Sequence, residues 1–544
     1  MARDLYYGDQ ARKRLQAGMN QLADAVKTTI GPKGRNVMVA GFGDRVFVTN
    51  EGSAVVKDFE LADITENLGA QMLKQVAEKT NEAVGDGTST AMLLTQAIIR
   101  GGTRNMAAGV NPMGLRRGIQ GAVNAAVQSI GESAYLPKGK EDIVQVASIS
   151  GADRQTGEIL GEIMDQVGQD GVITIEDSQT MDTSFEIVKG SQFDKGYLSE
   201  YMVTDTEKME AMLEHPYILF TDKKISSLGD IIPILDKVAQ CGRKLLIVAE
   251  DVEGEALKAL VINKLQGAID SVAVRAPGVG ERKKALVDEL ALLTGATVVR
   301  EETGYDLKKA TVDMLGEAEK VTVRKDRTII VGGAGDKAAI AEEIEKLRRM
   351  LAEAKDEFAV DRARERLGKL AGGVAVIRVG AASELELKEK KARVEDALNA
   401  VRAALAEGIV AGGGVAFCNA IPAVRKYAQQ LTGDELSGAQ VVMEALEEPM
   451  RQIAQNAGFD SGVVASEAVK QGNGVGLDVI TGEFVRMAEV GIVDPAKVTK
   501  LALKNAASMA SVFLTTEVDV IDPIDEAWLR SGGKTREESN KKVY

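Results

Sequence analysis

The chain has 544 residues, of which 45% are hydrophobic and 27% charged, enough for about three or four domains with substantial cores. His215 is the single histidine and Cys241 and Cys418 are the only cysteines, which excludes a disulfide scaffold, a zinc cluster and a histidine-based catalytic triad. The formal net charge is −14 without a long basic run, so neither nucleic acid nor an anionic membrane is an expected partner.

The first fifty residues predict a helix followed by a β-hairpin. The N-terminus has no apolar signal core and no apolar run approaches membrane-spanning length, so we expect a cytoplasmic protein. Apolar residues recur every three or four positions from Leu15 to Val26, which predicts a helix over residues 11–30. This helix should end at Gly31-Pro32, and short strands are expected at residues 37–39 and 46–49.

A glycine-rich stretch at residues 84–90 has two explanations. Gly85 and Gly87 flank Asp86, and three hydroxyl residues follow before an apolar helix begins. N–H groups at a helix start attract anions, glycines let the backbone approach a ligand, and Asp86 could hold a magnesium ion, so the stretch fits a phosphate cradle. A turn that only caps an ordinary helix explains the same residues without a ligand.

The middle of the chain predicts an α/β region. A domain edge is expected at residues 136–140, and from Gly171 onward short β-rich runs alternate with helices. The strands expected are residues 172–175, 217–220 and 245–249. Helices over residues 228–238 and 256–265 carry apolar residues on more than one stripe, which fits either a partner surface or fully buried core helices.

The next segment predicts a helical hairpin and then a second long helix. Apolar residues spaced by three and four predict an amphipathic hairpin over residues 340–370, and the pair Gly372-Gly373 before a buried strand is a natural hinge. A further helix is expected over residues 383–407, with Val394 on its apolar face. Asp396 lies about 200° from Val394 around this helix, so the periodicity predicts a solvated surface charge.

Two shorter features follow this helix. The run Gly412-Gly413-Gly414 opens another helix and offers a second place where the backbone could approach a ligand. Further on, Asp494 precedes Pro495, and this pair predicts an N-cap residue followed by the first residue of a helix.

Five segments in this order resemble signatures of group I chaperonins, the GroEL type. They are Thr29 to Val37, Asp86-Gly87-Thr88, Gln192 to Ser199, Ala249 to Leu257, and Val394 to Leu398. Together they are specific, although each alone would be weak. The resemblance runs from Ala2 to about Pro523 and therefore covers nearly the whole chain.

The resemblance implies a multidomain chaperonin fold with α and α/β parts. Residues 1–133 and 407–544 would form a mostly helical equatorial domain, with a charged tail from about residue 530. A small α/β intermediate domain would comprise residues 134–188 and 375–406, and an α/β apical domain residues 189–374. Movement about Gly372-Gly373 and Gly408 would couple nucleotide state to the position of the apical domain.

The resemblance also implies an ATPase that uses ATP and Mg²⁺, with K⁺ as a further candidate ion. Asp86 would bind magnesium, and Asp396 and Glu51 would act in hydrolysis, Asp396 by orienting the attacking water. The residues implied at the nucleotide are Thr29, Ile30, Gly31, Pro32, Asn50, Asp86, Gly87, Thr88, Ser89, Thr90, Ile149, Ser150, Gly413, Ile492 and Asp494, the last near the ribose.

The apolar residues of the middle region gain a role from the resemblance. They match positions that bind unfolded polypeptide clients and a GroES-type co-chaperonin, namely Tyr197, Tyr201, Met202, Ile232, Leu235, Leu257, Val261 and Ile262. Methionine replaces the usual aromatic residue at position 202 and suits promiscuous apolar contacts. The expected assembly is a homo-oligomer of stacked heptameric rings.

The sequence departs from the family pattern at three places that bear on the expected function. Asn50-Glu51-Gly52 replaces Lys-Asp-Gly, which predicts slow or differently regulated ATP turnover, Leu477 to Ile480 replaces Tyr-Asn-Ala-Ala near the adenine, and a charged tail replaces Gly-Gly-Met repeats. An ATP-insensitive or slow-turnover holdase or scaffold is the alternative function. A metabolic phosphotransferase also suits the phosphate loops but leaves the apolar helices unexplained.

Overall fold

The computed structural model divides into two compact units. Unit 1 is built from Met1–Gly161 and Lys391–Tyr544, and unit 2 from Glu162–Lys390. The residues that the structure describes are 4–40, 46–57, 59–167, 172–178, 180–188, 190–206, 208–278, 280–300, 306–353, 366, 370, 374–472 and 474–521. Within these ranges no helix is both long enough and apolar enough to cross a membrane.

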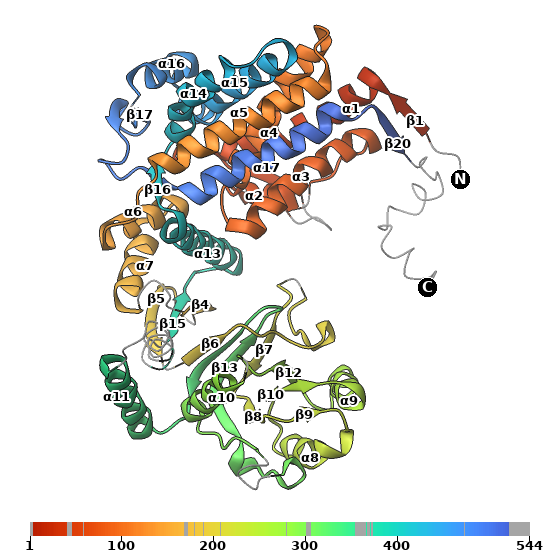
Figure 1. Cartoon of the computed structure of the whole chain (residues 1–544), viewed down its shortest axis with the longest axis vertical. Helices are drawn as coiled ribbons and strands as arrows, with labels where there is room; N and C mark the ends of the chain where they lie inside the picture. The colour runs from red at the N-terminus through yellow and green to blue at the C-terminus, as the bar shows by residue number, and fades with distance from the viewer. Residues whose placement is uncertain are drawn as a thin grey trace. The chain divides into compact units, whose positions relative to one another are not determined.

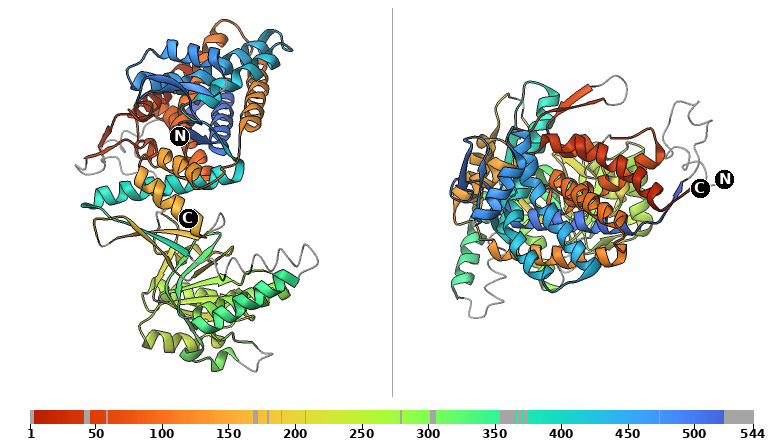
Figure 2. Two further views of the ribbon diagram at one scale, coloured as in Figure 1. Left: turned by 90° about the vertical axis from the view of Figure 1, so that its left-hand side faces the viewer. Right: turned by 90° about the horizontal axis from the view of Figure 1, so that it is seen from above.

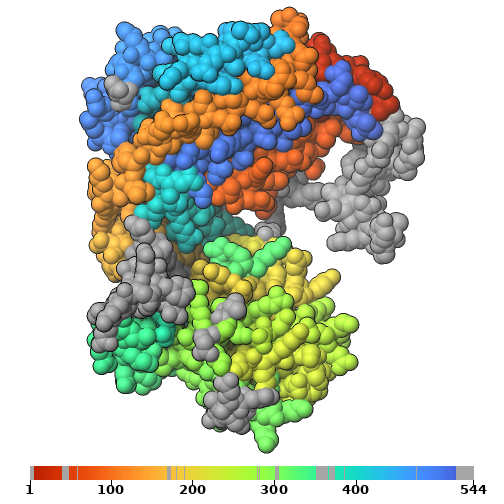
Figure 3. Space-filling view, viewed as in Figure 1, coloured from red at the N-terminus to blue at the C-terminus, as the bar shows by residue number. Residues whose placement is uncertain are grey.

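Unit 1 is a bundle of long helices (Figure 1). The main ones are α1 (Gly8–Val26), α3 (Ile64–Val84), α4 (Thr88–Ala107), α5 (Pro112–Ser133), α14 (Val415–Ala428), α15 (Gly433–Asn456) and α17 (Ala496–Thr515). α5 packs against α14, α15 and α17, and in Figure 3 the surfaces of α5 and α17 form adjoining bands. The apolar faces of these helices supply one continuous core, in which Leu15, Leu22, Leu94 and Phe513 are fully buried.

Shorter elements complete unit 1. The helices are η1 (Lys27–Thr29), α2 (Gly52–Lys57), α6 (Lys140–Ser150), the start of α7 (Arg154–Val167), α16 (Ser461–Gln471) and most of α13 (Glu384–Glu407). The antiparallel strand pairs are β1 (Asp4–Tyr7) with β20 (Val518–Ile521), β2 (Val37–Ala40) with β3 (Val46–Thr49), β16 (Ile409–Ala411) with β19 (Val493–Pro495), and β17 (Val475–Asp478) with β18 (Glu483–Arg486). β2 and β3 project from the helices (Figure 2).

Unit 2 is built around a seven-stranded sheet with the order β12-β10-β8-β13-β14-β6, with β7 also pairing with β13. Its strands are β6 (Gly190–Phe193), β7 (Ala211–Glu214), β8 (Tyr217–Phe220), β10 (Leu245–Ala249), β12 (Ser271–Arg275), β13 (Gly316–Val323) and β14 (Thr328–Gly333). β8, β10 and β12 are parallel, and every residue of β10 is buried, as expected for a parallel strand covered on both faces.

Unit 2 also contains two smaller sheets and several helices. β15 (Val374–Val379) pairs parallel with β4 (Val172–Asp177) and antiparallel with β5 (Ser184–Val188). A third, two-stranded sheet joins β9 (Lys224–Ile225) and β11 (Asp251–Val252). The helices are η2 (Glu200–Met202), η3 (Leu228–Asp230), α8 (Ile232–Gln240), α9 (Gly254–Leu265), α10 (Glu281–Thr294), η4 (Leu307–Lys309), η5 (Val312–Met314) and α11 (Lys337–Glu353).

Most predicted elements are confirmed within a few residues. The helix expected over residues 11–30 is α1 with η1, and the helix expected over residues 383–407 is α13. The hinge at Gly372-Gly373 and the charged tail from about residue 530 lie outside the described residues, as does the second arm of the hairpin after α11 apart from Arg366 and Leu370. The edges of the three expected domains stay a prediction.

One local prediction is wrong. Asp494 is not the N-cap of the last long helix, because Pro495 occupies the N-cap position of α17. Asp494 lies one residue earlier in β19, where it pairs with Val410 of β16. The strand pairing fixes Asp494 outside the helix, so its side chain is available for another role.

Candidate functional site

The loop between α3 and α4 depends on two glycines. Gly85 is the C-cap of α3 with φ +67°, and Gly87 is the N-cap of α4 with φ +78°, both in the left-handed region that favours glycine. A Cβ on Gly85 would lie 2.1 Å from Asn399 Nδ2, and one on Gly87 would lie 2.6 Å from Val498 Cγ1. Glycine is therefore required at both positions for conformation and for space.

This loop leaves the start of α4 open to an anion. The first N–H groups of a helix have no intrahelical acceptor, and glycine at the N-cap has no side chain to accept from them. Thr88, Ser89 and Thr90 supply those N–H groups together with three hydroxyls. The arrangement suits phosphate oxygens, because N–H groups and the helix dipole both favour negative charge there.

Asp86 lies between the two glycines and is held by two hydrogen bonds. Its Oδ2 accepts from Ser150 Oγ at 2.8 Å and its Oδ1 accepts from the backbone N–H of Gly87 at 2.5 Å. Burial raises the pKa of Asp86, although both hydrogen bonds act to lower it. A cation bound beside Asp86 would therefore stabilise the charged form of this buried carboxylate.

Two more carboxyl groups respond to the charge of Asp86. Burial raises the pKa of Asp396 to about 8, with further contributions from the negative charges of Glu51, Asp86 and Glu395. Burial and the charge of Asp86 raise the pKa of Asp494 to about 7. Glu51, Asp86, Asp396 and Asp494 therefore converge from four separated stretches of the chain.

The prediction that Asp396 is a solvated surface charge is wrong. Its helix, α13, packs inside unit 1, where Ala403 is buried together with Val84 of α3 and Val498 of α17. The face of α13 that helical periodicity assigned to solvent is turned toward the Asp86 loop, and Asp396 is half-buried there. Periodicity finds the most apolar face of a helix but does not show what covers the opposite face.

The acidic cluster fits Mg²⁺ bound together with a phosphate. Among the described residues no group of three or more His, Cys, Asp or Glu side chains is arranged to hold a metal ion by itself. Mg²⁺ commonly takes one or two carboxylates and completes its shell with water and substrate phosphates. Asp86 beside the open start of α4 matches that mode, because the ion's charge would offset the clustered carboxylates.

The loop before α2 lies against this site. A Cβ on Gly52 would meet Ser89 Oγ at 2.0 Å, so the Ser89 side chain packs directly against the Gly52 backbone. Glu51 accepts a hydrogen bond from Ser53 Oγ, and Asn50 Oδ1 accepts one from Arg393 of α13 at 3.4 Å. The two residues that depart from the Lys-Asp-Gly pattern thus lie beside the hydroxyls of α4.

The other predicted nucleotide residues form two groups. η1 packs against α4, which brings Thr29, half-buried Ile30 and exposed Gly31 and Pro32 to the same end of unit 1. The Thr29 hydroxyl already donates to the Val26 carbonyl at 2.8 Å. The second group is near the β16–β19 pair, where the Gly412 N–H donates to the Ile492 carbonyl at 2.9 Å, Gly413 has φ +64°, and exposed Ile149 adjoins Ser150 in α6.

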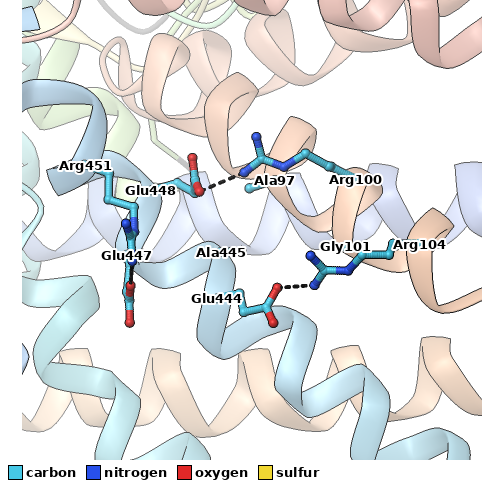
Figure 4. A pocket seen from close by; sticks show the side chains of 9 residues that line it. All are labelled: Ala97, Arg100, Gly101, Arg104, Glu444, Ala445, Glu447, Glu448 and Arg451. Carbon is cyan, nitrogen blue, oxygen red and sulfur yellow. Dashed lines mark hydrogen bonds and ion pairs between the residues drawn. The ribbon is translucent and has the colours of Figure 1, made fainter. Parts of the chain in front are cut away.

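A separate charged groove lies between α4 and α15 (Figure 4). Its volume is about 340 Å³. Arg100 pairs with Glu448 at 2.7 Å and Arg104 with Glu444 at 2.5 Å across the groove, while Glu447 and Arg451 pair along α15. The groove shares no lining residue with the acidic cluster, and its charges are already matched, so it is not the candidate phosphate site.

In unit 2, the predicted client-binding residues divide between surface and core. Tyr201, Ile262 and Ile232 have 68%, 52% and 42% of their surface exposed, while Leu257 and Val261 are partly buried against the core. Tyr197, Met202 and Leu235 are buried. The expected surface position of these three residues is therefore wrong. Met202 is fully buried, and its sulfur accepts a hydrogen bond from the Ala273 N–H at 3.3 Å.

Sequence reasoning missed several residues that shape the site. Arg393, Asn399 and Ser53 approach it as single polar side chains, and no motif or spacing marks them. Only the packing of α13 and α2 against the Asp86 loop identifies them. A family model described as the TCP-1/cpn60 chaperonin family matches residues 22–522 of this chain.

Proposed function

This chain belongs to the TCP-1/cpn60 chaperonin family, and on that premise we propose that it is an ATP-driven protein-folding machine of the group I, GroEL type. A chaperone role follows from the family. The convergence of Glu51, Asp86 and Asp396 at the glycine-capped start of α4 carries the ATPase part of the proposal. A cytoplasmic location and the three-domain division given above belong to the same proposal.

In this proposal each group at the site has a defined task. Thr88, Ser89 and Thr90 donate to phosphate oxygens, and Asp86 holds Mg²⁺, which supplies positive charge to the triphosphate. Asp396, aided by Glu51, orients the attacking water. The rest of the nucleotide pocket is formed by Thr29, Ile30, Gly31, Pro32, Asn50, Gly87, Ile149, Ser150, Gly413, Ile492 and Asp494, and K⁺ is a candidate second ion.

Exposed apolar residues of unit 2 support capture of unfolded chains. Tyr201 belongs to η2, which packs against α9, the helix that carries Ile262. α9 also contacts η3. η3 in turn contacts α8, the helix that begins with Ile232. An apolar patch of this kind binds non-native polypeptide and the apolar loop of a GroES-type partner without sequence specificity.

Two small sheets of unit 1 support assembly into rings, which we propose are stacked heptamers. In β1 and β20, Leu5 faces Val520 and Tyr7 faces Val518, and all four side chains are exposed. In the projecting β2–β3 pair, Met38 faces Val48 and both are exposed. Exposed apolar faces on two-stranded sheets favour pairing with a neighbouring copy of the chain.

A second function, a slow-turnover holdase, is favoured by one observation. Asn50 and Glu51 replace the family's Lys-Asp pair beside Ser89, which removes a cation and lengthens a carboxylate. A shift of about 1 Å in a catalytic group can lower the rate by about 10²-fold. Such a chain would still bind clients but release them slowly.

Steady-state ATP hydrolysis and refolding of a stringent client test the proposal directly. We expect hydrolysis that requires Mg²⁺, stops with EDTA and falls by about 10²-fold or more in Asp396→Ala, with client refolding that needs ATP and co-chaperonin. Client binding without hydrolysis in the unsubstituted chain would favour the holdase. Native mass with and without ATP and co-chaperonin would give the ring stoichiometry.

A further inference from the structure

Asn456, the last residue of α15, holds the turn at the end of α1 through its side-chain amide. Its Nδ2 donates to the carbonyl oxygens of Lys27 and Ile30, each at 2.9 Å, and lies 3.4 Å from that of Thr28. Its Oδ1 accepts from Gln452 Nε2 at 2.8 Å. The bond from Gln452 fixes which end of the amide points to the carbonyl groups.

The contact supplies hydrogen-bond donors to backbone carbonyl groups at the end of a helix. The carbonyl groups at the end of a helix have no intrahelical donor, and those of α1 and η1 therefore require an outside partner. The Arg35 N–H donates to Thr28 at 2.8 Å, and the Gly34 N–H donates to Gly31 at 2.9 Å, which folds the loop back on itself. Asn456 supplies donors on the other side.

Two neighbours of Asn456 hold the same loop. A Cβ on Gly31 would lie 3.1 Å from Ile453 Cγ2, so this side chain packs directly on the Gly31 backbone. Lys33 Nζ lies 5.6 Å from the centre of the Phe459 ring, within range of a cation–π interaction. The end of α15 and the residues after it thus contact the loop from Lys27 to Lys33 at three places.

We propose that Asn456 is a positioning residue for ATP binding, which acts by holding the Thr29 to Pro32 backbone against the nucleotide. This inference rests on the proposed function, because it takes those residues as nucleotide contacts. Among the described residues, the hydrogen bonds of the Asn456 side chain join it to backbone carbonyl groups and to Gln452. Its loss should therefore weaken ATP binding while the acidic groups that carry hydrolysis stay in place.

Asn456→Asp is the sharpest variant, because it keeps the size of the side chain and replaces both donors with a charged oxygen facing carbonyl oxygens. Gln455→Glu is the matched control, since it adds the same charge to the preceding residue, which is exposed. We expect KM for ATP to rise about tenfold or more in Asn456→Asp and to stay within about twofold in the control. kcat should change by less than about threefold in either.

Amide hydrogen exchange without nucleotide gives a second readout. The amides of Gly34 and Arg35 should exchange about tenfold faster in Asn456→Asp than in Gln455→Glu. Asn456→Ala, which removes the donors without adding charge, should show smaller changes in the same direction and serves if Asn456→Asp does not fold. Unchanged KM together with unchanged exchange would overturn the inference.

The two proposals can fail separately. If the unsubstituted chain neither binds nor hydrolyses ATP, the proposed function is wrong, and exchange at Gly34 and Arg35 alone decides whether Asn456 holds the loop. If the unsubstituted chain hydrolyses ATP and Asn456→Asp shows the KM of the control, only the role of Asn456 is wrong.

Discussion

Ser150, the last residue of α6, donates a hydrogen bond of 2.8 Å to Asp86, the carboxylate between the two glycines that open α4. This bond opposes the burial that raises the pKa of Asp86, so it helps to keep the group ionised. Ser150→Ala should therefore raise the Mg²⁺ concentration needed for half-maximal ATP hydrolysis by about three- to tenfold. A magnesium titration at saturating ATP measures the effect.

Ser148 provides the control for this change. Its hydroxyl is buried in the same helix and has no hydrogen-bond partner among the described residues. Ser148→Ala should leave the magnesium titration unchanged. Equal curves for the two variants would contradict the role given to Ser150.

The raised pKa of Asp396 predicts a pH-dependent stability. Between the usual aspartate pKa of 3.8 and the folded-state pKa of about 8, the folded chain holds a proton that the unfolded chain has lost, so this group makes stability fall as pH rises. Asp396→Asn removes the effect and should be more stable than the parent above pH 8 by on the order of 5 kcal/mol, since each unit between the two pKa values corresponds to about 1.4 kcal/mol. Near pH 4 the difference should vanish.

Urea unfolding in EDTA without nucleotide, at several pH values between 5 and 9, measures this difference. The gap in midpoint between Asp396→Asn and the parent should widen through that range and level off above the folded-state pKa. A gap that is constant across the range would show that Asp396 does not titrate in the packed state of α13.

Gly85→Ala should disturb the contact between α13 and the Asp86 loop. The new Cβ would lie 2.1 Å from Asn399 Nδ2 and would also strain a residue at φ +67°. Gly109→Ala is the control, because Gly109 has φ +94° and no heavy atom within 4 Å of its Cβ position. We expect Gly85→Ala to cost about 1 to 3 kcal/mol more than Gly109→Ala by thermal unfolding.

Asn399→Ala tests the origin of that extra cost. The double variant Gly85→Ala, Asn399→Ala should recover part of the difference, because the amide group at 2.1 Å is gone while the Cβ of residue 399, 2.8 Å from the new methyl group, remains. No recovery would show that the Asn399 amide group does not cause the extra cost.

Glu51→Asp together with Asn50→Lys should raise the ATP hydrolysis rate. The pair restores the family's Lys-Asp sequence in the loop that lies against Ser89, with a cation near the phosphates and a shorter carboxylate. A gain of about tenfold or more in kcat is expected from repositioning a catalytic group. An unchanged steady-state rate would remove the basis for slow turnover.

The two cysteines should differ sharply in reactivity. Burial raises the pKa of Cys418 to about 12, whereas Cys241 is exposed. At pH 8 a thiol reagent should modify one cysteine in the native protein and both after denaturation, because the thiolate is the reacting form. Cys241→Ser should abolish the native reaction, and modification of Cys418 in that variant would contradict the expectation.

Local patterns in the sequence were enough to predict most elements but not the site's assembly. The spacing from Leu15 to Val26 predicted α1, and the apolar run at residues 245–249 predicted the strand β10, because both depend on neighbouring residues. Asp396 was assigned to solvent because periodicity contains no information about α3 and α17 packing on α13. Asn456 carried no signal, since its partners lie more than 400 residues earlier.

The pairing of β1 with β20 has a consequence for how the chain is made. Four residues at the beginning of the polypeptide can find their hydrogen-bonding partners only after residues 518–521 have left the ribosome. The helical unit is therefore complete only after residues 518–521 have been synthesised, while residues 162–390 form an uninterrupted segment that can fold earlier during synthesis. A nascent chain arrested at residue 450 should show protease protection over the inserted segment and none over the first 160 residues.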